Sequence, residues 1–140
     1  MKTVDNKNLI VSGAHSLRVL NADKLVSLGV LQGGAYILTL DKGTEFNAVP
    51  GSVQPSDTFE EGVFNKLITF RVGNVTPART ALLEALRVER LVAIYVDEQG
   101  NQKVAGSIDF PMAFTYTITG GLYECRLTGS GTIPNPYLMP

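Results

Sequence analysis

The residues best suited to chemistry are few. His15 is the only histidine and Cys125 the only cysteine. A Cys–His pair could act as nucleophile and base, because a thiolate attacks once a neighbouring base has taken its proton. Cys125, however, falls on the apolar side of LYECRLTG, where a free cysteine usually packs as a small hydrophobic side chain. We therefore expect no catalytic residue at either position.

Carboxylates and glycine-rich segments also give no site. Asp57, Glu60 and Glu61 cluster in a polar stretch, but paired carboxylates hydrolyse glycosides only where a cleft raises one pKa. One histidine and one cysteine are too few for a typical structural zinc site. The segments LQGGAY and LTGSGT lack the lysine of a phosphate-binding loop. The sequence predicts no catalytic, metal or cofactor site, and it disfavours an enzyme.

Composition indicates one globular domain, residues 1–140. The chain has 140 residues, 44% of them apolar, and a net charge of −1. Such a near-neutral chain has no electrostatic reason to bind nucleic acid or an anionic membrane. It contains no run of eighteen apolar residues, so no transmembrane helix is expected. With one cysteine it forms no internal disulfide, and we expect a soluble protein that folds in the cytoplasm.

The elements that would position a site are mostly strands. SLRVL (16–20), GAYILTL (34–40) and FNKLITFRV (64–72) combine β-forming residues with flanking turn residues or alternation. One helix is expected over 77–89, because Thr76 can cap it and Pro77 suits the first helical position. The fold class is therefore mainly β, a sandwich or partly open barrel of antiparallel strands with one packed helix.

The strand expected at 91–96 is apolar on both faces. LVAIYV has no polar position, which is typical of a strand buried on both sides. Its cover could be the preceding helix or another protein chain. A polar turn, DEQGN, follows it, and the stretch 91–129 predicts an antiparallel meander of three or four strands.

Two other segments have no obvious place in a compact domain. Residues 41–62 are polar and contain two prolines, and a connection of this length is unusual. They predict either a surface loop or an arm that reaches a neighbouring subunit. The tail 132–140 contains three prolines and would extend unless it docks on another surface. Segment 21–34 is ambiguous between a helical turn and a short strand.

About half of the chain, 62–131, resembles structural proteins of tailed bacteriophages and prophages, of the tail-tube and head–tail connector type. The likeness is carried by ARTALLEAL, VAIYVDEQGNQKVAGS, DFP and YECRLTGSG. It implies a β-sandwich subunit that assembles with identical copies into a ring, with a hexamer expected, and that contacts other tail or connector proteins. It also implies a place in the virion after assembly in the bacterial cytoplasm.

On this hypothesis the subunit contacts come from the polar segment, the apolar strand and the tail. The candidate contact residues are Phe59, Glu60, Glu61, Leu91, Tyr95 and Tyr137. An alternative is a small-ligand-binding or adhesin-like β-barrel module, in which apolar residues line a pocket. An enzyme of unrecognised type is the third class.

Overall fold

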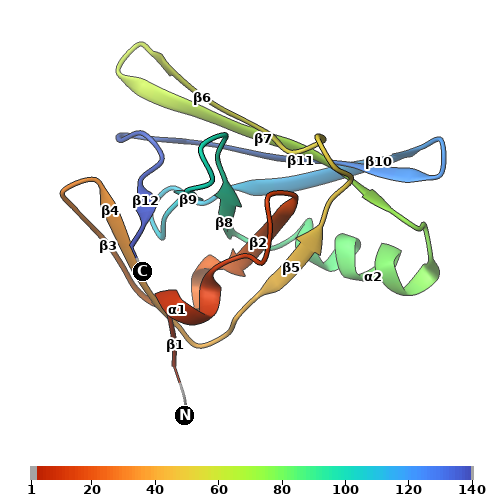
Figure 1. Cartoon of the computed structure of the whole chain (residues 1–140), viewed down its shortest axis with the longest axis horizontal. Coiled ribbons are helices and arrows are strands. Elements are labelled where there is room, and N and C mark those ends of the chain that lie inside the picture. Colours follow the sequence, from red (N-terminus) through yellow and green to blue (C-terminus); the bar gives the residue numbers. More distant parts are fainter. Residues whose placement is uncertain (1–2, 140) are drawn as a thin grey trace.

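The structure is a computed structural model that describes residues 3–139, and it consists of two β-sheets (Figure 1). The predicted fold class, mainly β with one packed helix, is confirmed. The eight-stranded sheet curls into a half-barrel and has the order β1-β4-β12-β9-β8-β2-β5, with β3 paired to β4. Its strands are β1 (Val4–Asp5), β2 (Ser16–Asn21), β3 (Leu25–Leu31), β4 (Gly34–Thr39), β5 (Thr44–Asn47), β8 (Leu91–Val96), β9 (Gln102–Ala105) and β12 (Tyr137–Leu138).

The second sheet has four strands in the order β10-β11-β7-β6, all antiparallel. They are β6 (Gln54–Glu60), β7 (Val63–Gly73), β10 (Ala113–Thr119) and β11 (Leu122–Gly131). Among the described residues there are two short helical elements and one longer helix. The short ones, α1 (Asn6–Leu9) and a 3-10 turn (Ala22–Lys24), precede β3, and the longer helix α2 (Pro77–Leu86) follows β7. Segment 21–34, which was ambiguous in sequence, is therefore mostly strand.

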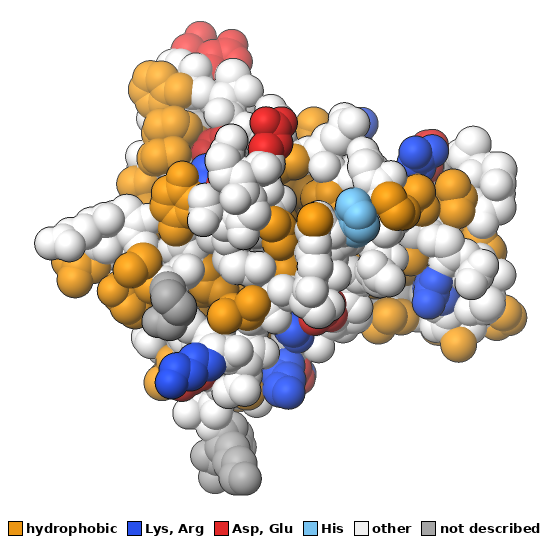
Figure 2. All heavy atoms as spheres, in the orientation of Figure 1, with side chains coloured by type: hydrophobic (Ala, Val, Ile, Leu, Met, Phe, Trp, Pro, Cys, Tyr) orange, Lys and Arg blue, Asp and Glu red, His pale blue; other side chains and the backbone are white. Residues whose placement is uncertain are grey.

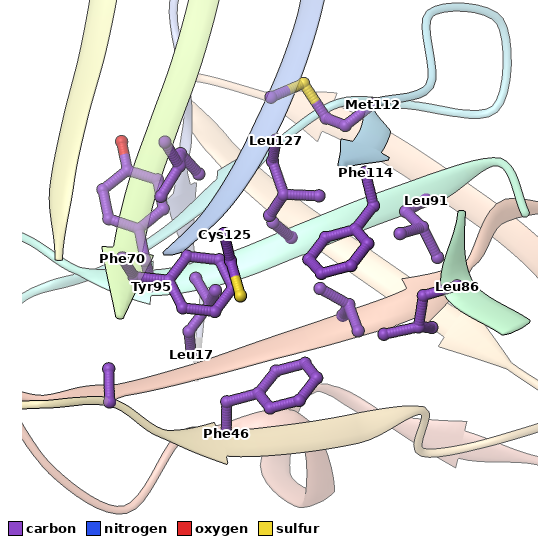
Figure 3. Close-up of a cluster of buried hydrophobic side chains, with 14 of the residues drawn as sticks. Leu17, Phe46, Phe70, Leu86, Leu91, Tyr95, Met112, Phe114, Cys125 and Leu127 are labelled. Carbon is purple, nitrogen blue, oxygen red and sulfur yellow. The ribbon is translucent and has the colours of Figure 1, made fainter. Parts of the chain in front are cut away.

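Two hydrophobic clusters hold the fold together. The larger fills the space between the two sheets, where side chains from both meet (Figure 3). The smaller lies on the other face of the eight-stranded sheet and includes Leu9 of α1, Ile37 of β4 and Leu138 of β12. Because each fully buried large apolar side chain contributes roughly 1.5–3 kcal/mol, the eight-stranded sheet is stabilised from both faces.

β8 is the strand that joins these clusters. Leu91, Ala93 and Tyr95 point into the larger cluster, and Val92 and Ile94 into the smaller one. All five are at most 3% exposed, so the predicted burial of this strand on both faces is confirmed. Its cover comes from the chain's own second sheet and from Leu83 and Leu86 of α2 on one side, and from α1 and β4 on the other.

Helix α2 begins where the sequence predicts. The Thr76 side chain accepts a hydrogen bond from the Arg79 amide at 3.1 Å, and Pro77 follows at the first helical position. Leu83 and Leu86 are buried in the larger cluster. The helix ends at Leu86, three residues earlier than the predicted end at 89, because the chain turns there to enter β8.

The prediction of a long loop over 41–62 is wrong. β5 occupies part of this segment and pairs with β2, while β6 pairs along its whole length with β7. β6 is polar because it is an edge strand whose outer face meets solvent. Its inward positions, Pro55, Asp57 and Phe59, recur at the two-residue spacing of a strand.

The C-terminal tail was expected to extend over 132–140; its residues 132–139 dock on their own chain instead, and Pro140 lies outside the described residues. β12 inserts between β4 and β9, pairing in parallel with Gly34 and Ala35. Leu138 is buried in the smaller cluster. The meander predicted over 91–129 is likewise divided, because β8 and β9 belong to one sheet and β10 and β11 to the other. The chain crosses between the sheets at 106–112.

Candidate functional site

The end of the β6–β7 hairpin, residues 58–65, projects from the four-stranded sheet (Figure 1); we call it the hairpin tip. Glu61 and Gly62 connect the strands with φ of 53° and 81°, as a two-residue type I′ turn requires. The rings of Phe59 and Phe64 lie 4.8 Å apart across the hairpin. Phe59 is nevertheless 62% exposed, because the tip extends past the opposing sheet.

The tip combines this apolar pair with acidic side chains. Glu60 and Glu61 are both exposed, and neither forms an ion pair with any residue between 3 and 139. Figure 2 shows acidic side chains at the end of the projecting hairpin with hydrophobic side chains behind them. An exposed aromatic pair beside unpaired carboxylates suits a partner that offers apolar and basic groups.

The four-stranded sheet has two open edges, β6 and β10. Within the described part of the chain, the outer edge of β10 has no backbone hydrogen-bond partner. β10 has the sequence AFTYTIT, without charge or proline, and Thr115 and Thr117 are exposed. Natural edge strands usually carry charges, prolines or a cover that prevents pairing, so β10 is unusually open to another strand.

A buried polar network lies at the base of the hairpin tip. The Lys66 ammonium donates to the Asn135 side-chain oxygen at 2.6 Å and to the Ile133 carbonyl at 2.9 Å. Asp57 lies 3.8 Å from the same ammonium and accepts from the Asn135 amide at 2.8 Å. The Asn135 side-chain amide donates to the Tyr95 hydroxyl at 3.0 Å. The network ties β6, β7 and β8 to the segment before β12.

Burial shifts the pKa of two groups in this network. It lowers the pKa of Lys66, against the opposing effect of the nearby Asp57 carboxylate. It also raises the pKa of the Tyr95 hydroxyl. Asp57 Oδ1 is buried without a hydrogen-bond partner, and the ammonium at 3.8 Å is its compensating charge. These features give the network a structural role, in which each polar group depends on the others for its hydrogen bonds or its charge partner.

An open groove of about 770 Å³ lies next to the network. Tyr95, Tyr137 and His15 line it, together with Asp57 and Lys103. The Lys103 ammonium lies 4.9 Å from the centre of the Tyr137 ring, a cation–π geometry. The groove is large enough for a small molecule.

The structure separates the six predicted contact residues into two groups. Phe59, Glu60 and Glu61 lie together at the hairpin tip, and Tyr137 is 46% exposed at the groove. Leu91 and Tyr95 are buried inside the chain, so their assignment as contact residues is wrong. The physical reason is that the chain provides both layers that cover β8.

Neither residue first considered for catalysis lies in a catalytic arrangement. Cys125 is buried in the larger cluster, and burial raises its pKa to about 12, so the reactive thiolate does not form near neutral pH. His15 lies at the groove instead. Among residues 3–139 no group of three or more His, Cys, Asp and Glu side chains is placed to hold a metal ion. In the same residues no helix has the length and apolar character to cross a membrane.

Comparison with known proteins adds no family. No protein-family model, no curated protein and no solved structure matches this chain.

The sequence did not indicate that Phe64 belongs to the hairpin tip, or that Lys66 and Asn135 form the buried polar network at its base. Two signals could have revealed the hairpin that positions them. Gly62 offers the positive φ that a tight turn needs, and the residues that follow it, 64–72, alternate in the manner of a strand. No sequence signal points to Asn135, because its partners are 40 or more residues away along the chain.

Proposed function

We propose that this chain is a structural subunit that assembles with copies of itself into a ring or tube, as a component of a phage tail tube or head–tail connector. Its partners are then identical subunits and neighbouring tail or connector proteins in a virion. The phage assignment rests on the resemblance of 62–131. The self-assembly rests on two surfaces of the four-stranded sheet.

The observation that carries the proposal is the open, uncharged edge of β10. Unpaired backbone amides and carbonyls along an edge readily accept another strand. The opposite edge of the same sheet, β6, carries Pro55, Asp57 and Glu60, which hinder pairing. Pairing of β10 in one copy with a different strand edge of the next joins the subunits in a head-to-tail manner, and such a contact closes into a ring when the rotation allows it.

The buried strand β8 lends no support to this proposal. It was expected to need a neighbouring subunit as cover, but its five buried side chains are covered by the chain itself. Support therefore comes from the sheet edges and from the hairpin tip, where apolar groups remain exposed.

The test is the mass of the purified protein in solution, measured by light scattering across a concentration series. We expect oligomers in the wild type, and a shift to single chains in Thr117→Lys/Thr119→Lys, which places two charges on the edge strand. The matched control is Thr128→Lys/Ser130→Lys, which adds the same charge to β11, an interior strand. A wild type that stays a single chain at the highest concentration would overturn the proposal.

A small-ligand-binding module is the second candidate, and the groove of about 770 Å³ is the observation that favours it. Tyr95 and Tyr137 give it aromatic walls. Mass spectrometry of the natively purified chain distinguishes the two functions, because a ligand-binding module would retain a stoichiometric small molecule as a single chain.

A further inference from the structure

We infer that the hairpin tip of one subunit docks on the outer face of α2 of the next copy. This inference deepens the proposed self-assembly and rests on it. It names a contact separate from the pairing of sheet edges, and it assigns each half of that contact to a surface that the single chain leaves uncovered.

The donor half is the hairpin tip. Along β7, the inward face of the four-stranded sheet is first apolar and buried, at Phe70 and Ile68. It then carries the hydrogen-bonded Lys66 and ends at the tip. Beyond Lys66 the opposing sheet no longer covers this face, and Phe59, which pairs with Phe64 on it, is 62% exposed. The tip is a regular two-stranded element, because the cross-strand register is continuous up to the turn.

The acceptor half is the outer face of α2. Leu83 and Leu86 occupy the core, yet the opposite side of the helix is also apolar. Leu82 is 39% exposed and Val88, just beyond the helix, is 87% exposed. Ala78, Ala81 and Ala85 are exposed on the same helix. A surface helix normally carries polar residues on its outer side, so this face is suited to a partner.

Charge selects the tip as the occupant of this face. The stretch 74–90 contains three arginines against two glutamates, whereas the tip has two carboxylates and no basic residue. Arg79, beside Leu82, donates to the Gly73 carbonyl and has no carboxylate partner among residues 3–139. Unlike charges around an apolar centre favour tip against helix and disfavour tip against tip.

The positions of the two surfaces fit a head-to-tail contact. The hairpin tip and α2 lie at opposite ends of the molecule (Figure 1). A contact between opposite ends of identical subunits leaves one free tip and one free helix at each step, so it propagates instead of stopping at a dimer. Such a contact adds to a ring or stacks one ring on another.

The experiment uses cysteine cross-linking between two different variants. One chain carries Glu61→Cys and the other Ala85→Cys, both at exposed positions. They are mixed and treated with a short bismaleimide, which does not react with Cys125 because that thiol is buried. We expect a two-chain product in the mixture and little in either variant alone. Adding Phe59→Ser to the Glu61→Cys chain should lower the yield about tenfold, since 1.4 kcal/mol of lost contact is a factor of ten.

The control pairs Glu61→Cys with Asn101→Cys, which lies in the exposed turn between β8 and β9, and it should give no product. If light scattering shows oligomers but the mixture gives no product, the docking is wrong while self-assembly stands. A product from Glu61→Cys alone would mean a tip-to-tip contact and would also overturn the docking. If no oligomers form at any concentration, both proposals fail.

Discussion

β8 and the hairpin tip are opposite cases of apolar side chains on a strand. β8 is apolar at every position, and all of its side chains except that of Val96 are buried. The tip lies in a stretch that is mostly polar, yet its Phe59 and Val63 remain exposed. The difference arises from what lies opposite: β8 runs through the middle of the eight-stranded sheet with a layer on each side, whereas the tip extends past the last layer.

This difference shows that the amount of apolar sequence does not locate a contact surface. A long apolar run is most often covered by its own chain, because it nucleates the core around itself. A few apolar residues at the end of a polar hairpin have no such cover. Experiments that change the two regions separately should therefore affect different quantities, the free energy of unfolding for β8 and the assembly for the tip.

The largest expected effect is that of Leu91→Asp. This residue is 0% exposed, and a carboxylate there would be buried without a partner, which costs more than about 4 kcal/mol. We expect the variant to be unfolded or to aggregate, with loss of the circular-dichroism signal of the native sheet.

The matched control for this change is Leu31→Asp, at the β3–β4 turn, where the leucine is 66% exposed. We expect its free energy of unfolding to lie within about 0.5 kcal/mol of the wild type. A Leu91→Asp variant as stable as this control would mean that β8 is not the centre of the core.

The second largest effect is expected from Lys66→Ala, at the boundary between covered and uncovered parts of β7. The change removes the donor to Asn135 and the charge next to Asp57. Breaking one side of a buried ion pair destabilises by about 3 kcal/mol, measurable by urea denaturation.

The double variant Lys66→Met/Asp57→Asn separates charge from packing. It removes both charges and keeps an oxygen to accept from the Asn135 amide, so we expect it to recover at least half of the loss. Equal losses in the single and double variants would show that the contribution comes from the hydrogen bonds of Lys66 to Ile133 and Asn135, which both variants lack.

The sequence predicts much of this fold where the pattern is local. Alternation in 64–72, the cap and proline at 76–77 and the apolar run of 91–96 each predicted an element that the structure contains. These signals work because strand and helix periodicity place neighbouring side chains on a common face. The strands are then arranged by distant pairings, which no local pattern reveals.

The errors have a common physical cause. β6, β12 and the division of 91–129 between two sheets all depend on partners far away in the chain. In sequence, the polar edge strand β6 resembles a loop because almost all of its residues are exposed and only Asp57 is part-buried. For the same reason Leu91 and Tyr95 were placed at an interface, since the sequence does not show that the chain itself supplies the second layer over β8.

Acidification is expected to lower the free energy of unfolding by a smaller amount, because an ion pair near the cover of β8 is lost. Arg18 of β2 donates to the Leu9 carbonyl of α1 at 3.0 Å and to the Glu45 carboxylate at 2.8 Å. Hydrogen bonding from Ser12, with the Arg18 charge, holds the pKa of Glu45 below its usual value of 4.5. The stability that this provides is present above that value and is lost as pH falls through the lowered pKa.

Urea denaturation at about pH 7, 5, 4 and 3 tests this contribution. We expect Glu45→Gln to be less stable than the wild type at neutral pH and to lose less stability on acidification. If the free energy of unfolding changes with pH to the same extent in the two proteins, Glu45 does not stabilise the α1 cover of β8.

The smallest effect on stability, with a large effect on assembly, is expected from Phe59→Ser. A cross-strand aromatic pair at an exposed position contributes only about 0.2–1 kcal/mol, so the free energy of unfolding should change by less than about 1 kcal/mol. Light scattering should nevertheless show smaller oligomers, because the tip loses its apolar centre. The comparable change in the core, Phe70→Ser, would unfold the chain and so reveals nothing about assembly. If Phe59→Ser instead destabilises the single chain by several kcal/mol, the tip belongs to the core, and the contrast with β8 disappears.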